Sequence, residues 1–198
     1  MSNSVPFTTK ELSKQTWGDF ERMFGKPGEW VTCWCMYYHR ARPVPKAERE
    51  GVPWKQRKEK IVKEKKKLTE EDRSHGILVY DGDDPVGWCQ YGPREELPRI
   101  DAGRRYKGLG LQQGSERLWR ITCFCVDKKY RNRGVASFGL KAALESIKWK
   151  GGGTVEAYPA ARRGALATWF GTVSMFDAHG FEKVAKFGKS NVLMRKQV

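Results

Sequence analysis

A short basic turn between an apolar run and a helical pattern is the part of this sequence best suited to chemistry. It contains Arg131, Asn132, Arg133 and Gly134, and two lysines stand just before it. Glycine lets the backbone approach a ligand closely, and the first amides of a helix have no partner within it. Arginine adds forked, charge-assisted bonds to phosphate oxygens. The turn therefore predicts a cradle for a diphosphate, against the plainer alternative of a surface turn with solvated charges.

The elements around this turn alternate in type. Residues 119–126 predict a strand, residues 135–148 predict a helix with one apolar face, and residues 154–158 predict a second strand. A glycine triplet at 151–153 ends the helix. Strand, helix and strand in this order form a βαβ unit, whose two strands run parallel in one sheet. We therefore expect a mixed α/β protein.

Elements on either side of this unit are also predicted. Residues 75–91 predict a hairpin, because Asp81 and Gly82 form a turn dipeptide between two β-rich runs. Residues 92–114 mix proline, glycine and charge without a period, so they predict a long surface loop. The expected closing elements are a helix over residues 174–179 and strands over residues 181–186 and 192–196.

The first 74 residues are expected to be mainly helical and to cap the substrate side of a core formed by residues 75–198. Thr8 and Glu11 suggest a capping box, which predicts a helix that ends near residue 25. The aromatic run 30–38 predicts a buried strand or loop. Residues 53–68 predict a charged helix with a narrow apolar stripe, formed by Trp54, Ile61, Val62 and Leu68.

Composition limits the class of protein. A chain of 198 residues with 39% hydrophobic content can bury one good core, so a single domain over residues 1–198 is expected. The sequence has no run of about 20 apolar residues and no secretory signal at its start, which predicts a cytoplasmic protein without a membrane span. Five cysteines, an odd number, favour reduced thiols over a disulfide framework. The formal charge of +15 favours a polyanion as a partner: a nucleic acid, an anionic membrane surface or a nucleotide cofactor.

Two motifs in order resemble those of a known family. Arg131, Gly134 and Ala136, spaced Arg-x-x-Gly-x-Ala at the start of a helix, look like the acetyl-CoA diphosphate motif of the GNAT superfamily of N-acetyltransferases. Residues 174–181 resemble the later helix and turn of that superfamily, and the Cys-Trp-Cys-Met and Gly-Trp-Cys-x-x-Gly-Pro-Arg-Glu motifs resemble a subgroup of it. The resemblance is strongest over residues 75–198. It implies a mixed, mostly antiparallel sheet with a central, splayed parallel strand pair flanked by helices.

The resemblance also implies an activity, which is transfer of an acetyl group from acetyl-CoA to an amine of a small-molecule or peptide acceptor by direct attack. The backbone of Phe124, Cys125 and Val126 would pair with the pantetheine arm of the cofactor. The Val126 amide could bind the oxyanion if the strand bulges there. The residues that would wrap the diphosphate are Arg131, Asn132, Arg133, Gly134, Val135, Ala136 and Ser137.

Proton transfer is predicted for two residues of the strand 154–158. Side chains alternate along a strand, so Glu156 and Tyr158 share a face, and the resemblance implies a general base at Glu156. The alternative for Glu156 is a buried carboxylate paired with one of the 38 basic residues. Phe176 stands where the family usually has tyrosine, so Tyr158 or water is expected to serve as the acid. Glu95 and Glu96 are rival bases.

The acceptor side is expected to be lined by aromatic and polar side chains. The candidates are Trp34, Tyr37, Trp88, Gln90 and Glu95, with Tyr38 and Trp169 as further aromatic residues. The net positive charge favours small or weakly charged amines over polycations. Cys33, Cys35 and His39 lack the fourth ligand of a recognisable zinc site, so no metal is expected. The cysteines are interpreted as small buried hydrophobic residues.

Two other functions are alternatives. The lysine-rich helix 53–68 suggests a nucleic-acid-binding module, but recognition motifs are missing and glutamates interleave the lysines, which argues against nucleic acid as a partner. A catalytically silent sensor of acyl-CoA is the second alternative, because Phe176 removes the usual acid. Monomer and homodimer are both compatible with the sequence.

Overall fold

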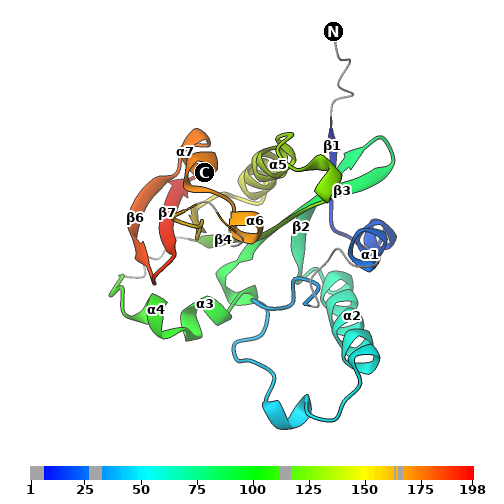
Figure 1. The fold of residues 1–198 in the computed structure, drawn as a ribbon. Helices are drawn as coiled ribbons and strands as arrows, with labels where there is room; N and C mark the ends of the chain where they lie inside the picture. Colours follow the sequence, from blue (N-terminus) through cyan, green and yellow to red (C-terminus); the bar gives the residue numbers. More distant parts are fainter. Residues whose placement is uncertain (1–6, 27–32, 112–116, 163, 165–166) are drawn as a thin grey trace.

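A seven-stranded sheet runs through this computed structural model, which describes residues 7–26, 33–111, 117–162, 164 and 167–198 (Figure 1). The strand order is β1-β2-β3-β4-β5-β7-β6. Among the described strands, β4 and β5 pair in parallel and all other neighbours pair antiparallel, which confirms the expected sheet. The strands are β1 (Thr8–Glu11), β2 (His75–Asp81), β3 (Asp84–Pro93), β4 (Leu118–Val126), β5 (Thr154–Ala157), β6 (Glu182–Phe187) and β7 (Asn191–Gln197).

Helices lie on both sides of the sheet and at its ends (Figure 1). The α-helices are α1 (Trp17–Gly25), α2 (Trp54–Glu70), α3 (Arg99–Ala102), α4 (Arg104–Lys107), α5 (Val135–Trp149), α6 (Ala167–Phe170) and α7 (Val173–Ala178). The short 3-10 helices are η1 (Lys46–Glu48), η2 (Arg94–Glu96) and η3 (Lys128–Tyr130). In the part of the chain that the structure describes, no helix combines the length and the apolar character needed to cross a membrane.

The alternation of side chains along the strands divides the core into two layers. Val79 and Cys89 pack in the cluster that contains the apolar face of α5. Their neighbours Leu78 and Trp88 pack in the cluster that contains the buried residues of α1. Since neighbouring strand residues point to opposite faces, α5 covers one face of the sheet and α1 covers the other. A third, smaller cluster joins Ile100 and Tyr106 of α3 and α4 to the sheet.

The parallel pair separates part-way along β4. The register between β4 and β5 runs from Leu118 with Thr154 to Ile121 with Ala157. Strand β4 continues to Val126, where its other edge still pairs with Gly87 of β3. Beyond Ala157 the chain turns away, and Ala160 bridges to Thr172 instead. The end of β4 therefore has one edge that is not paired with β5.

The N-terminal segment differs from its prediction. Residues 8–11 form β1, which pairs antiparallel with β2, and the helix begins only at Trp17. The capping-box prediction was wrong because pairing with the edge of β2 overrides a local signal of about 1 kcal/mol. In the aromatic run, residues 30–32 lie outside the described residues, and the part from Cys33 onward forms turns rather than a strand.

Two further predictions need correction. The segment 92–111 contains η2, α3 and α4 rather than an open loop, because Leu97, Ile100 and Tyr106 are buried. In α2, the fully buried side chain is that of Lys65, whereas Trp54 of the predicted apolar stripe is 42% exposed. The hairpin 75–91, the strand 119–126 and the helix 135–148 are confirmed to within a few residues.

Gly87 allows α5 to lie close to β3, and its substitution tests this packing. A β-carbon at Gly87 would lie 2.3 Å from Val135 Cγ1 and 3.2 Å from Val79 Cβ. We expect Gly87→Ala to lower the free energy of unfolding by about 1–3 kcal/mol, measured by urea denaturation. Gly18→Ala is the control, because a β-carbon there meets no atom within 4 Å and α1 should gain about 0.5–1 kcal/mol. Equal destabilisation by both changes would contradict the close packing.

Candidate active site

A cavity of about 430 Å³ lies where the end of β4 meets the start of α5. It is lined by Val126, Tyr130, Arg131, Asn132, Gly134, Val135, Ala136, Ser137, Thr172 and Met175. The lining brings together most of the residues that the sequence assigned to the diphosphate. It also includes Thr172 and Met175 from the start of α7, which sequence reasoning missed because they lie far away along the chain.

The backbone of the turn is shaped for an anion. Asn132 and Gly134 have positive φ angles of 60° and 83°, and asparagine and glycine are the residues that tolerate this left-handed region best. The first bond of α5 runs from the Phe138 amide to the Gly134 carbonyl at 2.9 Å. The amides of Val135, Ala136 and Ser137 therefore precede the helical hydrogen bonds and point out of the helix start, where an anion is stabilised. A β-carbon at Gly134 would meet no atom within 4 Å.

The side chains of the turn are partly engaged already. The Ser137 hydroxyl lies 2.7 Å from Nε2 of His179, at the end of α7. Burial, together with Lys196 and Lys141, lowers the pKa of His179, so its neutral ring can accept this hydrogen bond. Arg131 Nε donates to the Val126 carbonyl at 3.4 Å. Ser137 is thus placed to offer its backbone amide to a ligand rather than its hydroxyl.

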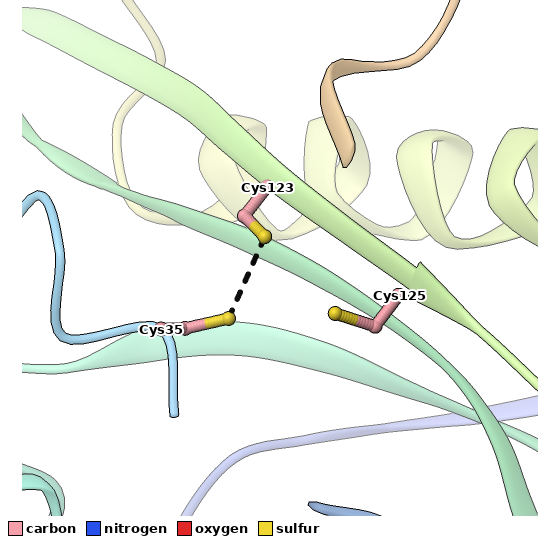
Figure 2. Close-up of side chains that lie close together, drawn as sticks. All are labelled: Cys35, Cys123 and Cys125. Carbon is pink, nitrogen blue, oxygen red and sulfur yellow. Dashed lines mark hydrogen bonds between the residues drawn. The ribbon is translucent and has the colours of Figure 1, made fainter. Parts of the chain in front are cut away.

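Side chains at the end of β4 point to both faces of the sheet. Phe124 points into the α5 layer and packs edge-on against Phe176, with 6.0 Å between ring centroids. Cys125 points to the opposite face, where its sulfur lies near those of Cys123 and Cys35 (Figure 2). The register with β3 shifts between Cys123 and Ile121, so the bulged residue is Thr122. The bulge considered at Val126 therefore lies four residues upstream of that position.

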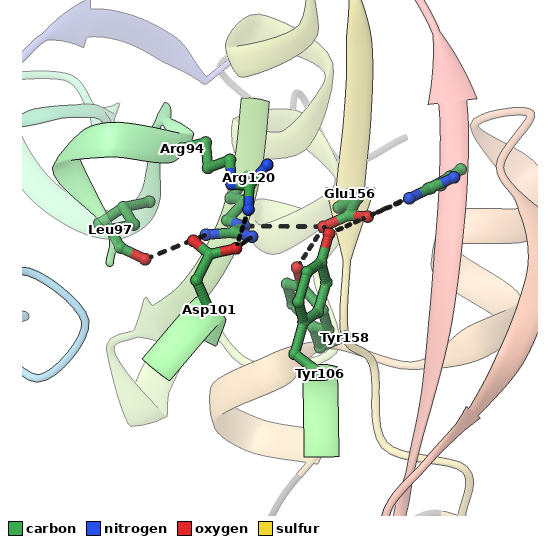
Figure 3. A network of polar contacts seen from close by, with 8 residues as sticks. Arg94, Leu97, Asp101, Tyr106, Arg120, Glu156 and Tyr158 are labelled. Atoms are coloured by element: carbon green, nitrogen blue, oxygen red, sulfur yellow. Dashed lines mark hydrogen bonds and ion pairs between the residues drawn. The ribbon is translucent and has the colours of Figure 1, made fainter. Parts of the chain in front are cut away.

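Glu156 is the centre of a buried polar network beside the separation of β4 and β5 (Figure 3). Its carboxylate accepts hydrogen bonds from Tyr106 at 2.9 and 3.0 Å and from Tyr158 at 2.5 Å. Arg195 donates to it at 2.7 and 3.0 Å, and Arg120 Nε lies 3.6 Å away. The alternative drawn from the sequence, a buried carboxylate paired with basic residues, describes these surroundings.

Arg120 extends this network to α3. Its guanidinium, fully buried, donates to the Asp101 carboxylate at 2.6 and 2.9 Å. Burial would raise the pKa of Asp101, but Arg120 and Arg94 outweigh that effect and lower it. Tyr158 is shifted in the opposite sense, because burial and the Glu156 carboxylate raise its pKa well above the ordinary value. Tyr158 is therefore a protonated phenol at neutral pH.

The remaining predicted proton-transfer residues lie elsewhere. Phe176 is fully buried in the α5 layer, in contact with Phe124 and Phe181, so it serves the core. Glu95 is exposed on η2 and lines neither of the two cavities described here. Glu96 binds His75 Nε2 at 3.3 Å through its carboxylate. Neither glutamate joins Tyr158.

A second cavity, of about 650 Å³, lies between α2 and the segment 33–49. Of the five predicted acceptor-binding residues, Tyr37 lines it and is 52% exposed. Trp34 and Trp88 lie in the α1 layer instead, because their large apolar rings fill the space between α1 and the sheet. Gln90 is also buried and donates to the Cys35 carbonyl at 2.8 Å. These three residues do not line the cavity.

Buried polar residues that sequence reasoning missed lie next to Gln90. Lys65 is fully buried, and its ammonium lies 3.3 Å from Nε2 of His39. His39 Nδ1 lies 2.9 Å from the Glu96 carbonyl, so it carries the proton and Nε2 accepts from Lys65 and from Gln90 at 3.1 Å. Burial lowers the pKa of Lys65 to about 8, against the opposing effect of the nearby thiols of Cys35, Cys33 and Cys123. The helical period could have indicated its position, because residue 65 lies on the same face as Ile61, Val62 and Leu68, but the charge of a lysine favours exposure.

Comparison with known proteins identifies the family. The model of the acetyltransferase (GNAT) family matches residues 35–167, which is more than half of the chain. The chain belongs to this family. Membership assigns it to acyl transfer with coenzyme A and confirms the resemblance to the GNAT superfamily. No curated protein shows significant sequence similarity to the chain.

Solved structures share the fold at low sequence identity. An acetyltransferase of the GNAT family from Desulfovibrio desulfuricans is 14% identical, with a TM-score of 0.55 over 97% of this chain and 99% of that one. The PaiA N-acetyltransferase from Thermoplasma acidophilum, in complex with coenzyme A, is 11% identical, with a TM-score of 0.54 over 98% of this chain and 100% of that one. A further acetyltransferase structure is 16% identical, with a TM-score of 0.60 over 96% of this chain and 99% of that one. At these identities the likeness establishes the GNAT fold.

Proposed function

We propose that this protein transfers an acetyl group from acetyl-CoA to the amine of a small-molecule or peptide acceptor by direct attack. The cavity between β4 and α5 is the observation that carries this proposal. It combines helix-start amides, a basic turn and a strand edge that is not paired with β5 in one place. The diphosphate would bind the amides of Val135, Ala136 and Ser137, with Arg131 and Arg133 beside it. The pantetheine arm would pair with the backbone of Phe124, Cys125 and Val126.

Proton transfer is proposed to depend on Tyr158 and Glu156 as a unit. The amine nitrogen attacks the thioester carbon and the C–S bond breaks, the amine proton passes to water, and the departing thiolate accepts a hydrogen bond from Tyr158 before it takes a proton from water. Tyr158 is suited to this step because its raised pKa keeps it protonated. Glu156 already accepts bonds from two tyrosines and Arg195, so we assign it the positioning of Tyr158 rather than the base role.

The second cavity is proposed to hold the acceptor. Its lining includes Arg49, Arg57 and Lys60, for which the described residues supply no ion pair. Its two carboxylates are those of Glu48 and Glu64, and Glu64 is paired with Arg40. Within the described residues, Arg57 Nε is buried and has no hydrogen-bond partner. An unpaired buried donor favours an anionic ligand. Trp54 and Tyr37 supply apolar surface beside these cations. We therefore propose an acceptor amine that also carries a carboxylate or phosphate, which refines the preference for weakly charged amines.

Cofactor binding is tested by Gly134→Glu. The new carboxylate would stand where the diphosphate binds, and like charges in contact cost several kcal/mol, so we expect affinity for CoA to fall by about 100-fold or more, measured by calorimetry. Gly51→Glu is the matched control, because Gly51 also has a positive φ (72°) and open space around its β-carbon. Unchanged CoA binding by Gly134→Glu would refute the cradle.

The role of Tyr158 is tested by Tyr158→Phe, with Tyr106→Phe as a matched control that also removes one hydroxyl from Glu156. We expect kcat of Tyr158→Phe to fall on the order of 10²-fold with the KM for acetyl-CoA unchanged. The kcat of wild type should not decline with rising pH below about 10, because the pKa of Tyr158 is raised. Equal losses in the two variants would mean that Tyr158 is only structural.

The charge of the acceptor is tested with pairs of amines that differ only there, such as amino acids and their amides. We expect kcat/KM to be about tenfold higher for the acids, since one favourable charge contact of about 1.4 kcal/mol gives this ratio. In Lys60→Gln the ratio should decrease while the KM for acetyl-CoA stays constant. Faster acetylation of the amides, or of polyamines, would contradict an anionic acceptor.

A further inference from the structure

Three cysteines from distant parts of the sequence meet on the α1 side of the sheet (Figure 2). The sulfurs of Cys35, Cys123 and Cys125 all lie within 4.8 Å of one another, and those of Cys35 and Cys123 are 3.6 Å apart. Cys35 and Cys125 are buried and Cys123 is partly buried. All five cysteines of the chain are free thiols. The three thiol groups take no part in the acyl transfer proposed above, in which only the backbone of Cys125 is assigned to the pantetheine arm.

The fold holds these thiols in place from two directions. Cys123 and Cys125 are two residues apart on β4, so they share a face. The loop that carries Cys35 approaches this face through two consecutive left-handed residues, with φ angles of 45° at Trp34 and 53° at Cys35. Gln90 fixes the loop by donating to the Cys35 carbonyl at 2.8 Å, and it accepts from Thr122 at 3.0 Å. The meeting of the three sulfurs is thus maintained by buried hydrogen bonds.

A buried positive charge lies near the cluster. Lys65 is fully buried, and no carboxylate of the described residues lies within 4.0 Å of its ammonium. Its ammonium lies 3.3 Å from Nε2 of His39 and 5.6 Å from the ring centroids of Phe20 and Trp88. A buried ammonium requires a compensating negative group. Cys35 and the Glu96 carboxylate are among the groups that favour its charged form, so a thiolate at Cys35 would add to the compensation of Lys65.

We propose that Cys35, Cys123 and Cys125 bind a thiophilic metal ion as three thiolates. Bonds of about 2.3 Å to one ion place three sulfurs about 4 Å apart, which matches the observed separations. On binding, three S–H bonds break, three metal–sulfur bonds form, and the protons pass to solvent without any change of oxidation state. The described residues contribute no fourth His, Cys, Asp or Glu ligand to this group. The ligand count therefore favours Cu(I), which accepts three sulfurs, over Zn(II), which takes four ligands.

The test uses the full chain, reduced and freed of metal, under anaerobic conditions. Cu(I) is titrated against a chromophoric chelator, Zn(II) is titrated separately, and Mg(II) serves as the hard-ion control. We expect one equivalent of Cu(I) to bind and to absorb in the ultraviolet as thiolates do when they ligate this ion. In wild type, Cu(I) should also slow alkylation of Cys35, Cys123 and Cys125, read peptide by peptide, while Cys89 on the opposite face serves as the internal control.

Variants make the assignment specific. Cys35→Ser and Cys123→Ser should each weaken Cu(I) binding by more than about 100-fold, since even partners of metal ligands are worth 10–100-fold. Cys89→Ala should bind as wild type does, and circular dichroism checks that each variant folds. The proposal is overturned if reduced wild type binds neither ion, or if its thiols are not protected. It is also overturned if Cys123→Ser retains full affinity, and tighter binding of Zn(II) than of Cu(I) would overturn the three-coordinate assignment.

Discussion

Arg120 and Glu156 face each other across β4 and β5, one residue before the last paired position of these strands. Both side chains are fully buried. Arg120 extends to Asp101 of α3, and Glu156 extends to Tyr106 of α4 and Arg195 of β7. A buried ion pair adds little net stability, but breaking one costs about 3–5 kcal/mol, so such a network keeps its members in one arrangement. The network therefore links β4, β5, β7, α3 and α4 at the place where β4 and β5 separate.

The position of this separation explains why the cofactor cradle lies at the end of β4. On one face of the sheet, the start of α5 packs against Gly87 and forms the cofactor cradle with the turn around Gly134. On the other face, α1 packs against Trp34 and Trp88. The second cavity lies between α2 and the segment 33–49. Because side chains alternate, Phe124 belongs to the first face while Cys123 and Cys125 belong to the second. A displacement of β4 would therefore change the geometry of the cofactor cradle and of the thiol cluster together.

The net charge of the chain does not show where its basic residues lie. Three groups of basic residues lie in different surroundings. They are the residues of the turn at 131–133, those that line the second cavity, and the buried residues Lys65 and Arg120. In the interior, Arg120 is paired with acids, whereas Lys65 has imidazole, rings and thiols as neighbours. The formal charge of +15 alone therefore says little about a partner, because these groups meet different chemical needs.

The sequence by itself determined the elements whose signals are local. The βαβ unit, the hairpin at 75–91 and the cradle at 131–137 were predicted, because hydrophobic period and turn chemistry are written in neighbouring residues. Only the tertiary structure decided that residues 8–11 form an edge strand, that Lys65 is buried, and that Trp34 and Trp88 belong to the core. It alone placed Cys35 beside Cys123, and it enclosed Glu156 among Tyr106, Arg120 and Arg195. Each of these outcomes depends on partners more than 20 residues away, and no local pattern encodes a long-range contact.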